Sequence, residues 1–264
     1  MADLPPFEPT SFKYTQSPNP SWSFGDPITT TEDGRKWVED EKQGWKTIDA
    51  TKEDPRTLYA LSVSGLVPRP IAFVSSVAAN GSENIAPFSW FNQVSTNPPV
   101  ISVSCSPAGR HKDTANNIRE TKGFTVNIIS EPWIVQANAA SIDAPAEINE
   151  WTVTGLTKEP SISVTAARVK ESAFTMECEL LQHIEIKNAA GGVAADLILG
   201  TVKYIHIRNA VLNDRGLVDP VKLRPVSRLG EIAYATIGDV FRIPRPVWKD
   251  EKDELENKFG NALL

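Results

Sequence analysis

Strand-like segments with few helices between them are the sequence feature that most limits the possible folds. Residues 100–105 and 124–129 alternate apolar with small polar side chains, which is typical of strands with two different faces. Two long segments, 175–186 and 194–207, flank the turn sequence Asn188-Ala-Ala-Gly-Gly, as in a long antiparallel hairpin. This order favours one β-barrel with peripheral helices over a parallel α/β sheet.

Turn and helix signals surround these strands. Asn80-Gly81 predicts a tight turn after the strand-like residues 71–77. Asp54 is a good N-cap, and Asp113 is expected to cap a helix that Gly123 follows. The predicted helices are residues 37–45, 54–65, 113–121, 133–140 and 249–258.

The chain divides into three parts by composition. Residues 1–50 form an N-terminal extension whose scattered aromatic side chains suit an arm lying across the barrel or across a partner subunit, with plain disorder as the alternative. Residues 51–248 form the barrel domain, and residues 249–264 form a charged C-terminal tail.

Charge and composition exclude several classes of protein. The formal net charge is −6, and the chain has no cluster of lysine and arginine, so general nucleic-acid binding is not expected. The N-terminus has no secretory signal, and no apolar run approaches the roughly 20 residues of a membrane span. Two cysteines, Cys105 and Cys178, cannot make a disulfide framework, so a reducing, cytoplasmic setting is expected.

Common catalytic and metal motifs are absent. The sequence has no phosphate loop, no dinucleotide fingerprint and no nucleophile elbow. A metal site at Cys178 and His183 would need two further ligands, so no metal is predicted. His183 and His206 are interpreted as ordinary strand residues, and no catalytic side chain is predicted.

Two elements have the chemistry of a ligand site. Residues 84–95 mix aromatic, small hydroxyl and amide side chains, which suits a planar heteroaromatic ligand bound through backbone edges. The alternative is that Phe88, Trp90 and Phe91 are core residues. At the second element, Lys112 stands at an expected helix start, where unpaired N–H groups favour a phosphate. The alternative here is a capped helix beside a solvated lysine.

Five motifs occur in a fixed order along the chain. They are Pro68-Arg-Pro-Ile-Ala-Phe-Val-Ser-Ser, Asn84-Ile-Ala-Pro-Phe-Ser-Trp-Phe-Asn, Asn97-Pro-Pro-Val-Ile, Lys112-Asp-Thr-Ala-Asn-Asn-Ile and Phe124-Thr-Val-Asn-Ile-Ile, with Arg228-Leu-Gly and Tyr234 near the end. Together they resemble the flavin reductase-like family of FMN-binding split barrels. The resemblance spans about residues 55–246. It implies a six-stranded Greek-key barrel that forms a homodimer with FMN near the subunit interface.

The resemblance also implies where FMN is held. Ser75 and Ser76 would lie beside the flavin, the segment from Ala86 would contact its ring and ribityl chain, and Lys112 would be near its phosphate. Cys105 is expected to be a packing residue and not a redox thiol. The implied FMN contacts are Arg69, Ser75, Ser76, Ala86, Pro87, Phe88, Ser89, Trp90, Phe91, Asn92, Ser104, Cys105, Lys112, Asp113 and Thr114.

The implied activity is that of an oxidoreductase. In a flavin reductase, NAD(P)H passes a hydride to FMN, and the protein supplies position and electrostatics. Two alternatives stay open from the sequence. One is an FMN-binding electron carrier or flavin storage protein that does not turn over nicotinamide. The other is a flavin-dependent oxygenase acting on a small molecule.

Overall fold

The computed structural model describes residues 4–9, 12–106, 111–145 and 147–263. The chain forms two compact units, each considered by itself. One unit joins Met1–Leu58 with Gly238–Leu264, and the other is Tyr59–Ile237. The N-terminal extension and C-terminal tail expected from the sequence therefore fall in one unit. The described part has no helix that is long and apolar enough to cross a membrane.

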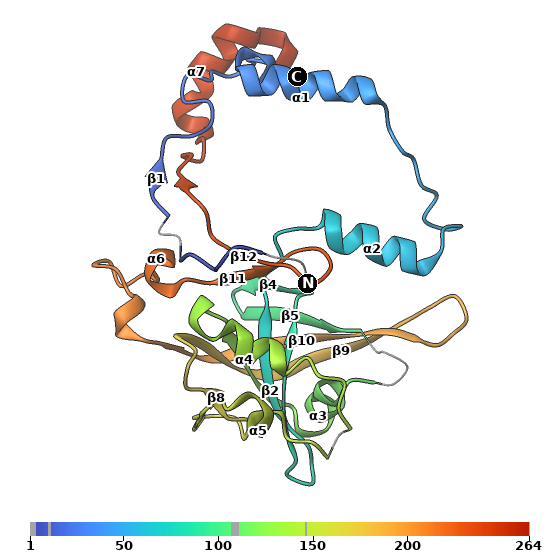
Figure 1. Ribbon diagram of the computed structural model, residues 1–264. Coiled ribbons are helices and arrows are strands. Elements are labelled where there is room, and N and C mark those ends of the chain that lie inside the picture. Colours follow the sequence, from blue (N-terminus) through green and yellow to red (C-terminus); the bar gives the residue numbers. More distant parts are fainter. Residues whose placement is uncertain (1–3, 10–11, 107–110, 146, 264) are drawn as a thin grey trace. The chain divides into compact units, whose positions relative to one another are not determined.

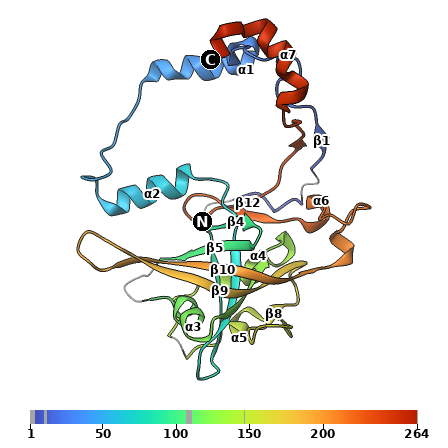
Figure 2. The ribbon, with the colours of Figure 1, turned by 180° about the vertical axis from the view of Figure 1, so that it is seen from behind.

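The larger unit is built on one antiparallel sheet (Figures 1 and 2). Its strand order is β3-β2-β6-β9-β10-β5-β4, and every pairing along it is antiparallel. The strands are β2 (Ala72–Val77), β3 (Glu83–Phe88), β4 (Phe91–Thr96), β5 (Pro99–Cys105), β6 (Gly123–Ile128), β9 (Phe174–Lys187) and β10 (Val193–Ile207). The predicted strands are confirmed.

The chain itself joins the two edges of this sheet. β3 pairs with β2 at one edge, β4 pairs with β5 at the other, and only Ser89 and Trp90 separate β3 from β4. The main-chain N–H of Ser104 donates to the carbonyl of Trp90 at this corner, with an N···O distance of 2.9 Å. With β3 and β4 counted as one bent run, the seven strands make six, which matches the expected six-stranded split barrel.

The β9–β10 hairpin is the longest element, and local chemistry explains its shape. At its turn, Asn188 Oδ1 accepts hydrogen bonds from the main-chain N–H groups of Ala190 and Gly192. Gly200 is required inside β10 because an added Cβ would lie 2.5 Å from Cζ of Phe124, which fills the barrel there. The predicted hairpin and its turn are confirmed.

Two apolar clusters cover the two faces of the sheet. The barrel interior contains Val74, Val103, Phe124, Val126 and Ile198, all without exposed surface. The second cluster packs the other face of β2 and β3 against the short helices. Its largest side chains are Phe73, Ile85, Ile129, Trp133 and Trp151. The ring centroids of Phe73 and Trp133 lie 5.5 Å apart in an edge-to-face arrangement.

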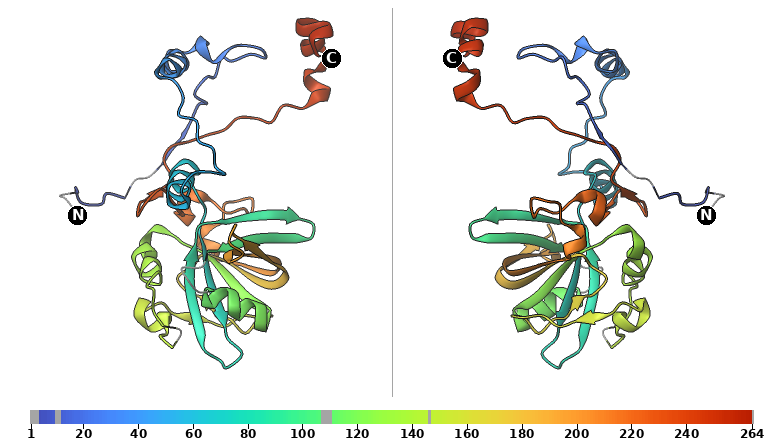
Figure 3. Two further views of the ribbon diagram at one scale, coloured as in Figure 1. Left: turned by 90° about the vertical axis from the view of Figure 1, so that its right-hand side faces the viewer. Right: turned by 90° about the vertical axis from the view of Figure 1, so that its left-hand side faces the viewer.

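The remaining elements of this unit surround the barrel (Figure 3). Helix α2 begins before the unit boundary. Of the predicted caps, one differs: Lys112 is the N-cap residue of α3, and Asp113 is its first helical residue. The elements are α2 (Pro55–Gly65), α3 (Asp113–Thr121), η3 (Glu131–Trp133), α4 (Ile134–Ala139), α5 (Glu150–Thr154), β7 (Lys158–Glu159), β8 (Arg168–Val169), η4 (Asn209–Val211), α6 (Pro220–Leu223), β11 (Val226–Arg228) and β12 (Tyr234–Thr236).

The smaller unit joins the two ends of the chain. Its strands β1 (Tyr14–Thr15) and β13 (Val240–Phe241) pair in parallel. Gly25 has a φ of +82°, and an added Cβ there would lie 2.6 Å from Cζ of Phe259. The other elements are η1 (Ile28–Thr30), α1 (Glu32–Asp40), η2 (Glu41–Gln43), α7 (Trp248–Phe259) and η5 (Gly260–Leu263). The first helix thus begins earlier than predicted, because Thr31 accepts from the Gly34 N–H and caps it.

Candidate functional site

The two sequence elements with ligand-site chemistry meet at one cavity, here called the α3 cavity. It has a volume of about 220 Å³ and is bordered by β3, the start of α3 and the loop after α4. The side chains around it are those of Asn84, Ala86, Pro87, Phe88, Lys112, Asp113, Thr114, Ala140, Ser141, Ile142, Asp143, Ala144 and Glu150.

A short hydrogen-bond chain ties the two elements together across the α3 cavity. Thr114 Oγ1 donates to Asn84 Oδ1 at 2.6 Å, and Asn84 Nδ2 donates to Glu150 Oε2 at 3.3 Å. The Thr114 side chain is almost fully buried, and its hydroxyl proton is used by Asn84. The start of the nine-residue helix α3 is therefore held against β3 at this cavity.

Charge at the α3 cavity does not by itself favour an anion. Among the described lining residues, Asp113, Asp143 and Glu150 stand against one ammonium, Lys112, whose Nζ lies 3.9 Å from Asp143 Oδ1. Burial, and to a smaller degree the charge of Asp113, raises the pKa of Glu150, so its carboxyl keeps a proton to higher pH. The positive groups at this cavity are the Lys112 ammonium and the N-terminal end of the α3 dipole.

A second cavity continues along β3, here called the corner cavity. It has a volume of about 270 Å³ and shares Pro87 and Ser141 with the α3 cavity. The Ser89–Trp90 corner of the barrel forms part of its wall. The residues around it are Tyr59, Val63, Arg69, Ile71, Pro87, Ser89, Trp90, Asn138, Ser141, Arg228, Glu231 and Tyr234.

Aromatic side chains give the corner cavity flat walls. The rings of Tyr59 and Trp90 have centroids 6.4 Å apart. Among the other residues of this cavity, the Arg228 guanidinium lies 4.5 Å from the Tyr234 ring centroid, and the Tyr234 hydroxyl donates to Asn138 Oδ1 at 2.8 Å. Such walls suit the faces of a planar ligand.

Arg69 connects several segments around the corner cavity by hydrogen bonds. Its guanidinium donates to the main-chain carbonyls of Val63, Leu66 and Leu229, and its Nε donates to Ser89 Oγ at 3.2 Å. The side chain is buried, so its charge stabilises the C-terminal end of α2. Arg69, one of the implied FMN contacts, therefore lines this cavity and not the α3 cavity that Lys112 lines.

Six of the expected contacts do not line either cavity. Ser76 accepts from Asn117 Nδ2 at 3.1 Å and so fixes α3 on β2. Asn92 is exposed and accepts from the N–H of Gln93, while Phe91 packs against the barrel interior. These six residues are Ser75, Ser76, Phe91, Asn92, Ser104 and Cys105.

The two cysteines are free and buried, as expected for packing residues. Burial, with a contribution from the nearby Asp196 carboxylate, raises the pKa of Cys105 to about 12. Burial also raises the pKa of Cys178. Neither sulfur is a thiolate at neutral pH, so neither has the reactivity of a redox thiol.

The interpretation of His183 and His206 as ordinary strand residues was incomplete. Each donates to a carboxylate that has no exposed surface: His183 Nε2 lies 2.7 Å from Asp196 Oδ1, and His206 Nε2 lies 2.7 Å from Glu177 Oε1. His111 Nδ1 also lies 2.8 Å from Asp196 Oδ2. The sequence signal for these pairs is an acidic residue inside an otherwise apolar strand segment.

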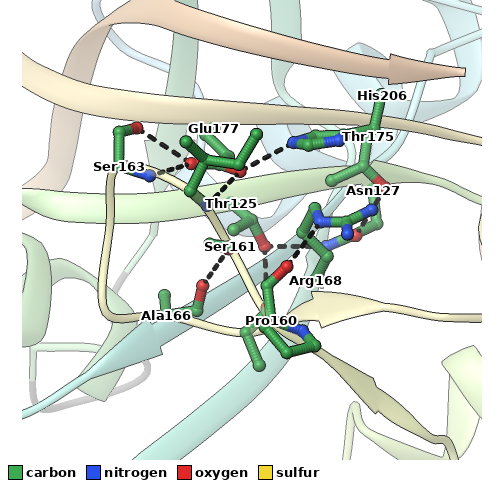
Figure 4. Close-up of polar contacts among 12 residues, drawn as sticks. Thr125, Asn127, Pro160, Ser161, Ser163, Ala166, Arg168, Thr175, Glu177 and His206 are labelled. Carbon is green, nitrogen blue, oxygen red and sulfur yellow. Dashed lines mark hydrogen bonds and ion pairs between the residues drawn. The ribbon is translucent and has the colours of Figure 1, made fainter.

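Glu177 is surrounded by donors from a loop (Figure 4). It accepts from the main-chain N–H groups of Ile162 and Ser163 at 2.8 and 2.7 Å, and from Ser163 Oγ at 2.8 Å. Burial acts to raise its pKa, but these hydrogen bonds and that of His206 outweigh it and lower the pKa to about 2. Among the described residues, no group of three His, Cys, Asp or Glu side chains could hold a metal ion.

Comparison with known proteins gives a consistent result. The family model of the flavin reductase-like domain matches residues 64–221. An uncharacterised protein of Halalkalibacterium halodurans is 36% identical over 197 residues, which cover 74% of this chain and 94% of that protein. An uncharacterised protein of Bacillus subtilis is also 36% identical, over 201 residues that cover 75% of this chain and 98% of that protein.

Solved structures share the fold. Nitrilotriacetate monooxygenase component B from Bacillus cereus has a TM-score of 0.73 and 33% identity, over 76% of this chain and 99% of its own. The 2-nitrobenzoate 2-nitroreductase of Pseudomonas fluorescens has a TM-score of 0.67 and 25% identity, over 77% of this chain and 98% of its own. A split-barrel protein from Shewanella frigidimarina, at 21% identity and a TM-score of 0.67, shows the likeness of the fold over 77% of this chain and 100% of its own.

Proposed function

Because the chain belongs to the flavin reductase-like family, we propose that it binds FMN along β3 and acts as an NAD(P)H-dependent oxidoreductase. The observation that carries this proposal is the Thr114–Asn84 hydrogen bond at 2.6 Å. It brings the helix start and the aromatic, amide-rich strand to one cavity. The adjoining corner cavity, with its aromatic walls, extends the same groove.

The donor set fits FMN when each cavity takes one end of it. The phosphate would lie at the α3 cavity, bound by the Lys112 ammonium and the N–H groups at the start of α3. The ring would lie along Ala86–Phe88 toward the Ser89–Trp90 corner, where Tyr59 and Tyr234 offer flat apolar surface. Arg69 would keep Ser89 in place through its Nε hydrogen bond.

When bound, FMN would supply a hydride acceptor and an electron relay, which no side chain can supply. The residues of the two cavities would bind it, orient it and limit water at its face. The described residues that line the two cavities include no histidine. A hydride transfer between stacked rings requires no such side chain.

Homodimer formation is part of the proposal. Val94, Leu181 and Ile205 each expose more than half of their surface on strands of the barrel sheet, at 56%, 56% and 52%. A contiguous exposed apolar patch marks a protein–protein contact, and the proposal is that these three side chains belong to one such patch. Light scattering on the purified protein measures its mass directly, and a monomer would contradict the dimer.

Flavin binding by the purified protein is the first test. Quenching of FMN fluorescence should give a tight complex, and riboflavin should bind more weakly because it lacks the phosphate. Lys112→Glu should weaken the binding of FMN by at least about tenfold and leave the binding of riboflavin nearly unchanged. Lys187→Glu, the same charge change at an exposed residue near the hairpin turn, is the control. Equal loss of both flavins in Lys112→Glu would contradict the phosphate site.

The reaction is tested by anaerobic mixing of the FMN complex with NADH or NADPH. Rapid bleaching of the flavin absorbance supports the reductase. No bleaching with either nucleotide would contradict it and favour the electron carrier or storage protein.

One observation favours a second candidate, direct reduction of a small aromatic molecule. The corner cavity has aromatic walls beside the Arg228 guanidinium, which suits an aromatic ring bearing an acidic group. The similarity to a nitroreductase agrees with this candidate. Consumption of 2-nitrobenzoate by the FMN complex and NADPH tests it.

A further inference from the structure

The buried carboxylate of Asp196 connects four segments of the larger unit. Asp196 lies on β10 opposite Cys105 of β5 and has no exposed surface. Its two oxygens lie 2.8 Å from His111 Nδ1 and 2.7 Å from His183 Nε2. The guanidinium of Arg119, in the last turn of α3, is 3.9 Å from Oδ1.

This carboxylate remains ionised at neutral pH. Burial acts to raise its pKa, but the hydrogen bonds from His111 and His183 outweigh burial and lower the pKa below that of an ordinary aspartate. A buried charge must be paired, so the two imidazoles are held firmly in place. The partners come from β9 and from His111, two residues before the start of α3.

His111 links this cluster to the α3 cavity. It is bonded along the chain to Lys112, the N-cap residue of α3, whose carbonyl accepts from the N–H groups of Ala115 and Asn116. On the other side of Lys112, Thr114 is held by Asn84. The backbone that presents the lysine and the helix start is therefore fixed from both sides, by Asp196 before the helix and by Asn84 within its first turn.

We propose that Asp196 is a positioning residue of the anion site at the α3 cavity and acts through His111. The inference rests on the proposed binding of a flavin phosphate there. Its consequence is selective: Asp196 and His111 contribute to the affinity for the phosphate end of the ligand and not to the affinity for the ring. His183 shares the same carboxylate but lies on β9, far from α3 in the sequence.

A matched pair of variants separates this role from a merely structural one. His111→Phe and His183→Phe each remove one imidazole from Asp196 and keep a flat ring. His111→Phe should raise the dissociation constant of FMN about tenfold and leave that of riboflavin within about twofold. His183→Phe should change the ratio of the two constants by less than about twofold. Asp196→Asn, which keeps the shape of the side chain, should behave like His111→Phe.

Thermal melting of each variant shows whether it is folded, and Glu177→Gln, the other buried carboxylate, is the control for general destabilisation. The inference is overturned if His183→Phe weakens FMN binding as much as His111→Phe does, or if His111→Phe weakens riboflavin binding as much as FMN binding. It is also overturned if the ratio of the two dissociation constants is unchanged in both His111→Phe and Asp196→Asn. A wild-type protein that binds FMN no better than riboflavin would instead break the proposed phosphate site, and the inference with it.

Discussion

Asp196 and Glu177 are buried carboxylates on the neighbouring strands β10 and β9, and each lies 2.7 Å from a histidine nitrogen. Their other partners differ in kind. The hydrogen bonds of Asp196 go to two imidazoles, one of which precedes α3. Glu177 accepts instead from two main-chain N–H groups and a hydroxyl of a loop, together with one imidazole (Figure 4).

This difference indicates that Glu177 fixes a loop on the barrel, whereas Asp196 fixes the segment beside the candidate ligand site. Main-chain N–H groups do not titrate, so Glu177 keeps the loop at Ile162 and Ser163 on the barrel as long as it is itself ionised. The hydrogen bonds of Asp196 depend instead on two histidine side chains, one of which lies two residues before α3. One cluster serves mainly folding, and the other lies next to the candidate ligand site.

The largest expected effect is on stability. Glu177→Gln should lower the free energy of unfolding by about 3 kcal/mol at pH 7, because an amide offers one acceptor where the loop presents several donors. Asp196→Asn should cost only about 1 kcal/mol, since an amide can accept from one neutral imidazole and donate to the other. Urea unfolding measures both values. A larger loss in Asp196→Asn than in Glu177→Gln would reverse the comparison.

The next effect is on acid stability. The pKa of Glu177 is lowered in the folded state to about 2, from a usual value of 4.5. Its contribution is therefore complete above about pH 4.5 and is lost as the pH falls toward 2, which should remove on the order of 2–3 kcal/mol. Unfolding followed by circular dichroism across this range should show a shallower pH dependence in Glu177→Gln. A slope identical to that of the wild type would contradict the assignment.

The smallest effect is on the thiols. Both cysteines are buried with raised pKa values, so iodoacetamide should label the native protein slowly. Cys105 faces Asp196 across β5 and β10, whereas Cys178 is next to Glu177 in sequence. Asp196→Asn should therefore increase the labelling rate of Cys105 several-fold more than that of Cys178, because the sheet would open locally around Cys105 more often. Mass spectrometry of the labelled peptides measures the labelling rate of each cysteine. Equal increases at Cys105 and Cys178 would contradict a local effect of Asp196.

The strands and turns could be predicted because their signals are local. The alternation in residues 100–105 and 124–129, the Asn188 turn and the Asn80-Gly81 turn depend on neighbours only a few positions away. Helix boundaries were less exact. The sequence is compatible with a cap at either Lys112 or Asp113. In the structure Lys112 has an extended backbone and is the N-cap, so the helix begins at Asp113.

The candidate site was predicted in part. The segment from Ala86 to Trp90 and the residues from Lys112 to Thr114 do line two adjoining cavities. Arg69 lines the corner cavity and donates to the carbonyl of Leu229, 160 positions away, a contact between segments with no common sequence pattern. The roles of Asp196 and Glu177 were missed, because a lone acidic residue in a strand does not reveal which donors will reach it.

By itself, the sequence determined a β-rich chain, its long hairpin and its membership of a flavin reductase-like family, because alternation, turn chemistry and motif order are properties of the linear chain. Only the tertiary structure decided that β3 and β4 close the barrel through the Ser89–Trp90 corner. It also decided that Thr114 reaches Asn84, 30 positions away, and that Asp196 reaches His111, 85 positions away. Strand register and barrel closure select these partners, and neither is encoded in any single segment.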